Sequence, residues 1–209
     1  MKSWAQSWMW RLLVVVCLSG AFPVTSHAVM VVPVNLEYMT QQADRIFLGR
    51  VLQIKDGFDE GGLWSQFVTF EVVDVYKGDL DDSLTIKQVN PQPPPGTETE
   101  GSVNLLAGVL PEYHEGQEVV VFLSPDSEIG FTSTIGLMQG TFYVMVDNAG
   151  KKIVVNTVQN HGLFKGLNVA ALHKAKGLSE NRLKALQGQP ASFGLMNMKA
   201  MVKGFLINE

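Results

Sequence analysis

Hydrophobic and polar residues alternate along the middle of this chain with the two-residue period of a β-strand. The strongest run, 67–76, is rich in β-branched and aromatic residues, and 83–89 alternates in the same way. A third run, 46–54, has the same character but contains Gly49, where we expect a β-bulge. These patterns predict three strands in the first half of the chain.

The second half also contains β-type patterns. Residues 119–123 are apolar without alternation, which predicts a strand that is buried on both faces. Residues 141–146 and 152–155 flank a turn-forming stretch at 147–150, so we expect a β-hairpin. The Pro-rich stretch 91–101 predicts an exposed loop, which is either a ligand-binding loop or a simple connector.

Helical spacing of apolar residues is found on both sides of this β-rich region. Residues 35–44 predict a short helix with Asn35 as its N-cap, and residues 195–206 predict an amphipathic helix. Ser179 is expected to cap a further helix. The order of these elements predicts a mainly-β fold: a small antiparallel OB-like barrel with a short N-terminal helix and a C-terminal helical extension.

Residues 1–28 have the layout of a secretory signal peptide. A start that contains Lys2 and Arg11 precedes the apolar run 12–18, and small residues stand at the third and first positions before the expected cleavage site. We therefore expect cleavage between Ala28 and Val29. The alternative, a transmembrane anchor, needs roughly 20 apolar residues, and this run is much shorter.

Cleavage would leave 181 of the 209 residues, divided into an OB-like domain at 29–160 and a helical extension at 161–209 that packs on it. The single cysteine and two of the 16 basic residues would be removed, so that 14 basic residues remain beside 20 acidic ones. Disulfides, thiolate zinc sites and thiol nucleophiles are then excluded. The acidic balance makes nucleic acid an unsuitable partner, and no integral membrane segment is expected after cleavage.

Three segments follow one another in a recognisable order. Residues 43–51 open a strand with Ala-Asp, residues 67–78 end a strand with Lys-Gly, and residues 116–123 open a strand with Gly. In this order they resemble the netrin-like module, whose best-known members are the tissue inhibitors of metalloproteinases, and also uncharacterised secreted bacterial proteins. The resemblance covers about 36–160 and implies an OB-like five-stranded barrel. Those inhibitors bind the zinc of their target through an N-terminal cysteine, which has no counterpart at Val29.

One histidine has several carboxylates near it in the sequence. His114 lies between Glu112 and Glu115, and Asp126 follows on the same part of the chain. These residues could form an acid–base or metal site, and the alternative is a solvated turn. The chain contains neither a Gly-x-Ser-x-Gly motif nor a phosphate-binding loop motif.

Two other groups of residues have a simple structural interpretation. Asp56, Asp59 and Glu60 resemble part of a calcium-binding loop, but their spacing fails at the third ligand position, so a hairpin loop is predicted. The methionines of 195–206 could bind Cu(I), but packing of an apolar helix face is favoured.

Together these observations predict an exported, non-catalytic binding or interaction protein of the periplasm or the extracellular space. Its expected partner is another exported protein, and one specific version is an inhibitor or accessory of an exported metalloprotease. The alternatives are a secreted hydrolase with a site near His114 and a structural component of an envelope or surface assembly. We assign no catalytic, metal-binding or cofactor-binding residue and expect no cofactor.

In a host that exports the chain, we expect the mature protein to begin at Val29. Ala28→Lys should block this cleavage, because the position before the cut requires a small residue, whereas Ala28→Ser should preserve it. The intact mass and the N-terminal sequence of the exported protein measure the outcome. A wild-type protein that is exported with residues 1–28 still attached would contradict the prediction.

Overall fold

The computed structural model describes residues 32–90, 92, 94–97, 108–168, 181, 184–186 and 193–207. All of them belong to one compact unit of the chain, Val32–Glu209. The predicted signal peptide and its cleavage site, Ala28 and Val29, lie outside the described residues. Most of the helix predicted to begin near Ser179 also lies outside them.

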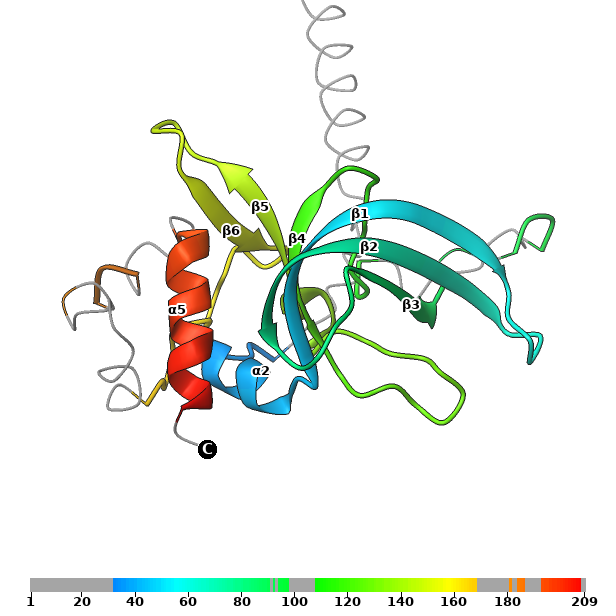
Figure 1. Ribbon diagram of the computed structural model, residues 1–209, viewed down its shortest axis with the longest axis horizontal. Coiled ribbons are helices and arrows are strands. Elements are labelled where there is room, and N and C mark those ends of the chain that lie inside the picture. Colours follow the sequence, from blue (N-terminus) through cyan, green and yellow to red (C-terminus); the bar gives the residue numbers. More distant parts are fainter. Residues whose placement is uncertain are drawn as a thin grey trace, which may run out of the picture. The chain divides into compact units, whose positions relative to one another are not determined.

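Six antiparallel strands form one sheet, and the fold is mainly β as predicted. The strands are β1 (Arg45–Phe58), β2 (Trp64–Lys77), β3 (Ser83–Val89), β4 (Glu118–Leu123), β5 (Thr141–Val146) and β6 (Lys152–Asn156). Their order across the sheet is β3-β2-β1-β4-β5-β6, so β1 and β4 are central (Figure 1). Helix α2 (Leu36–Gln42) precedes the sheet, the 3-10 helix η1 (Leu137–Gly140) precedes β5, and α5 (Leu195–Leu206) follows β6.

Strand β1 is irregular at Gly49. Its pairing with β2 shifts register between Leu48 and Gly49, where the sequence predicted a bulge. A Cβ atom at Gly49 would lie 2.8 Å from Cε2 of Phe47 and 3.2 Å from the carbonyl oxygen of Glu71. Glycine is needed here because the Phe47 ring and the neighbouring strand occupy the space that a side chain would fill.

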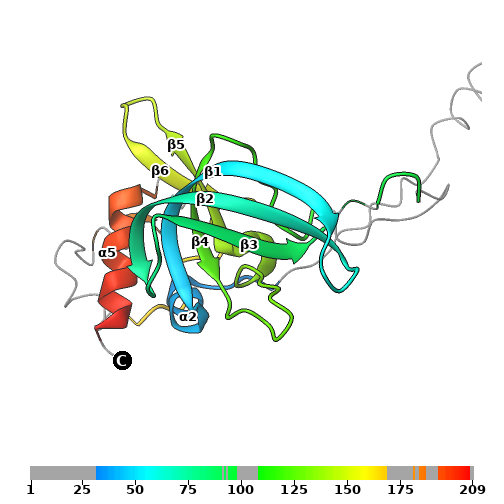
Figure 2. The same cartoon turned by 45° about the vertical axis from the view of Figure 1, so that its right-hand side comes forward.

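The sheet curls, and β3 comes close to the segment that follows β4 (Figures 1 and 2). Single bridges pair Lys87 with Phe131 and Leu123 with Thr134. The Thr132 amide donates a hydrogen bond to the carbonyl oxygen of Lys87 at 2.9 Å. Among the described residues an isolated bridge, rather than a continuous ladder, links β3 to this segment, so closure into a barrel stays a prediction.

Two hydrophobic clusters lie on opposite faces of the central strands. On β4, Val119, Val121 and Leu123 belong to one cluster, to which β1, β2 and β3 also contribute. Val120 and Phe122 belong to the other, which α2 and α5 cover. All five side chains are fully buried. The prediction that this strand is buried on both faces is therefore confirmed.

The two helices agree with the patterns that predicted them. The Oδ1 atom of Asn35 accepts a hydrogen bond from the Tyr38 amide at 2.8 Å and caps α2. On α5, Met198 and Met201 are buried, whereas Met196 is 77% exposed, which confirms the packing interpretation for the two inward methionines. Within the described residues, no helix has both the length and the apolarity needed to span a bilayer.

We expect Phe122→Ala to lower the free energy of unfolding by about 3–5 kcal/mol, because the deletion of a fully buried ring leaves a cavity beside Phe142. Met196→Ala is the control and should change this free energy by less than about 0.5 kcal/mol, since its side chain is exposed. Urea unfolding followed by circular dichroism measures both variants. Equal effects of the two substitutions would contradict the assigned core.

Candidate functional site

A hollow of about 800 Å³ lies between the tip of the β1–β2 hairpin, strand β3 and the loop 124–133. In Figure 1 the hairpin tip and this loop both point toward the right of the view, with the loop below β3. We call this space the Lys87 hollow. Its lining residues are Phe58, Asp59, Glu60, Gly61, Leu63, Phe67, Thr85, Ile86, Lys87, Asp126, Glu128, Ile129 and Gly130.

Lys87 joins the three segments that surround the hollow. It lies on β3, and its Nζ donates to Oδ2 of Asp59 in the hairpin turn at 2.9 Å and to the carbonyl oxygen of Ile129 in the loop. The same Nζ lies 4.5 Å from the centroid of the Phe131 ring, a cation–π contact. Because only 19% of the Lys87 side chain and 7% of the Asp59 side chain are exposed, water screens this ion pair weakly.

Asp59 also builds the hairpin turn. Its Oδ1 accepts hydrogen bonds from the amides of Gly61 at 3.0 Å and Leu63 at 2.8 Å, the local pattern that makes aspartate frequent in turns. The hydrogen bond from Lys87, followed by that from the Leu63 amide, holds the pKa of the Asp59 carboxyl below its usual range. The predicted hairpin loop is confirmed, and both oxygens of Asp59 have partners within the protein.

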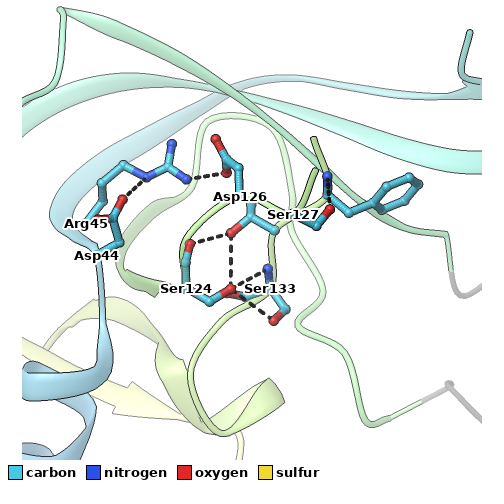
Figure 3. A network of polar contacts seen from close by, with 8 residues as sticks. Asp44, Arg45, Ser124, Asp126, Ser127 and Ser133 are labelled. Carbon is cyan, nitrogen blue, oxygen red and sulfur yellow. Dashed lines mark hydrogen bonds and ion pairs between the residues drawn. The ribbon is translucent and has the colours of Figure 1, made fainter. Parts of the chain in front are cut away.

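Hydrogen bonds within the 124–133 loop fix the opposite wall of the hollow (Figure 3). At its base, the Ser124 amide donates to the carbonyl oxygen of Ser133 at 2.9 Å. At its tip, the Ser127 amide donates to the carbonyl oxygen of Phe131 at 2.7 Å, and the Phe131 amide donates to Oγ of Ser127 at 3.0 Å. The loop therefore has a defined conformation before any ligand binds.

Arg45 connects this loop to the start of β1. Its guanidinium forms ion pairs with Asp44, with Nε and Oδ2 3.3 Å apart, and with Asp126 of the loop (Figure 3). About 13% of the Arg45 side chain is exposed, whereas both carboxylates are about half exposed. The single positive charge of Arg45 is thus shared between two carboxylates, one of which, Asp126, lines the hollow.

Large apolar side chains are exposed around the mouth of the Lys87 hollow. Phe58 and Leu63 of the hairpin are 63% and 47% exposed, and Ile129 of the loop is 60% exposed. The Phe58 ring contacts Trp64, with ring centroids 5.0 Å apart, and Nε1 of Trp64 donates to the carbonyl oxygen of Gln92 at 2.7 Å. Apolar surface on both walls of one hollow favours ligand binding.

A second, smaller hollow of about 340 Å³ contains His114 and Glu112 in its lining. Tyr143 also lines it, and its hydroxyl donates to the carbonyl oxygen of Glu112 at 3.0 Å. Burial raises the pKa of Tyr143. The Glu115 carboxylate accepts from a backbone amide of β1, and Asp126 lies in the Lys87 hollow. The structure therefore brings His114 and Glu112 together but places Asp126 elsewhere.

Other predicted features are described in part or lie outside the described residues. Ala28 and Val29 lie outside, and of the Pro-rich stretch 91–101 only 92 and 94–97 are described. Within the described part of the chain, no group of three or more His, Cys, Asp or Glu side chains is placed to hold a metal ion.

Sequence reasoning missed Lys87. The residue is one polar position of an alternating strand, and its partner Asp59 lies 28 positions earlier in a turn that the pattern described only as a hairpin loop. The available signal was weak: a lysine on the strand that follows a hairpin whose turn contains an aspartate and two glycines.

Comparison with known protein families and with curated proteins finds no match to this chain.

We expect Asp59→Asn to be less stable than the wild type at neutral pH and the difference to shrink as the pH falls from about 5 to 2. The folded-state pKa of Asp59 is depressed, so the ionised carboxylate stabilises the folded protein in full above the unfolded-state pKa, about 3.9. That contribution is lost as the pH falls through the lower folded-state value.

Urea unfolding at a series of pH values measures this difference. Asp56→Asn is a matched control on the same hairpin, because Asp56 accepts from the Gln66 amide group rather than from a cation. A stability difference between wild type and Asp59→Asn that stays constant down to pH 2 would contradict the role of the ion pair.

Proposed function

We propose that this protein is an exported, non-catalytic binding protein that holds part of another exported protein in the Lys87 hollow. The observation that carries the proposal is the exposure of Phe58 and Ile129 on opposite walls of one hollow. Its volume of about 800 Å³ falls within the usual range for ligand sites, roughly 300–1,000 Å³. When a ligand covers exposed apolar surface of this kind, the removal of that surface from water favours binding.

Rigid walls support the same proposal. Asp59 holds the hairpin turn, Lys87 ties that turn to the loop, and Arg45 ties the loop to β1. A site that is ordered before the ligand arrives loses less conformational entropy on binding, which increases affinity.

Export is proposed from the pattern of residues 1–28 alone. The netrin-like resemblance remains a prediction. So does the more specific role as an inhibitor or accessory of an exported metalloprotease, since that role required the position of Val29, which lies outside the described residues.

A library of random peptides displayed on phage, selected on the purified protein, tests the hollow. Synthetic copies of enriched peptides should bind the wild type and lose about tenfold or more in affinity with Ile129→Ser, because a buried isoleucine side chain is worth about 1.5–3 kcal/mol. Isothermal titration calorimetry measures each dissociation constant.

Leu52→Ser is the matched control. Leu52 is 51% exposed on the same hairpin and lies outside the hollow, so its substitution should change the affinity less than twofold. Enriched peptides that bind wild type and Ile129→Ser equally would overturn the proposed site. Turnover of ester or peptide substrates that disappears in His114→Ala would instead favour the hydrolase alternative.

A further inference from the structure

The carboxylates of the Lys87 hollow outnumber its cations. Asp59, Glu60, Asp126 and Glu128 line it together with one ammonium, Lys87. Asp59 neutralises Lys87, and Arg45 pairs with Asp126. Glu60 and Glu128 are exposed, and neither forms an ion pair with another described residue. The mouth of the hollow therefore carries negative charge that the protein does not balance.

Each of these two glutamates lies next to an exposed apolar side chain. Glu60 follows Phe58 by two positions on the hairpin, and Glu128 precedes Ile129 on the loop. The two walls of the hollow thus present the same combination of an apolar side chain and a carboxylate. A complementary ligand carries bulky apolar groups and positive charge close together.

The edge of β3 indicates the backbone conformation of such a ligand. The carbonyl oxygen of Lys87 faces the loop, where it accepts from the Thr132 amide. Thr85 lies two residues earlier on the same strand and also lines the hollow, so its backbone groups point toward the same edge. Among the described residues, β2 is the only strand that pairs with Thr85. An extended segment can therefore add beside β3 at this point.

We propose that the ligand of the Lys87 hollow is an extended segment of a partner protein in which Lys or Arg stands next to bulky apolar residues. This inference rests on the proposed function and adds the chemistry of the ligand. The apolar residues cover Phe58 and Ile129, and the basic residues pair with Glu60 and Glu128. Anionic lipid surfaces are disfavoured as ligands because the same carboxylates repel them.

The peptides enriched by phage selection test this chemistry directly. We expect them to contain Lys or Arg beside aromatic or branched apolar residues, and to bind about fivefold more weakly to the double variant Glu60→Gln, Glu128→Gln, since each exposed ion pair contributes a small amount. Asp81→Asn, an exposed substitution outside the hollow, should leave the affinity unchanged. Raising the salt concentration should weaken binding to the wild type more than to the double variant.

A charge exchange makes the test specific. The variant Glu60→Lys, Glu128→Lys should bind peptides in which Glu replaces the basic residues, and bind the original peptides least well. Peptides that lose affinity with Ile129→Ser but contain no basic residue and do not respond to the glutamate substitutions would overturn the proposed ligand chemistry while supporting the hollow as a site. Peptides that do not respond to Ile129→Ser would overturn the proposed function itself.

Discussion

The burial of β4 and of the first part of β1 on both faces is the constraint on which the rest of the fold depends. Their alternating side chains enter two hydrophobic clusters, one lined by β1 to β4 and one covered by α2 and α5. A polar side chain on either face of β4 would lie in an apolar cluster without a partner. Both the curl of the sheet and the positions of the two helices satisfy this requirement, because each covers one face of the central strands.

Around the Lys87 hollow, ion pairs and hydrogen bonds compensate charged groups for lost contact with water. Lys87 and Asp59 lose most of their contact with water, and they recover interaction energy through hydrogen bonds with each other and with backbone groups. Removal of either partner leaves the other charged and poorly solvated, which costs more than the pair itself contributes. Arg45 is similarly buried, but its partner Asp126 on the loop is half exposed. These pairs are best understood as fixing the geometry of the two walls.

The alternation of residue types predicted most of the fold, because period and burial are local properties of a strand or helix. The bounds of β3 and α5 agree with the patterns at 83–89 and 195–206, and Gly49 marked a real irregularity in β1. The Lys87 hollow could not be predicted in this way. Its walls come from segments that are distant in sequence, and only the curl of the sheet brings them together. His114 was a candidate because Glu112 and Glu115 are its neighbours in the sequence, yet only Glu112 lines the same hollow.

The two ends of the β1–β2 hairpin differ in burial. Near Phe47 both strands pack in a hydrophobic cluster, and Gly49 has no room even for a methyl group. Near Phe58 the same strands project beyond the clusters and contribute mainly surface. Apart from Asp59, which holds the turn, exposed positions at the far end can therefore change without disturbing the hydrophobic clusters. Descendants of this chain could acquire new binding partners through changes in the hairpin tip and the facing loop while the interior remained the same.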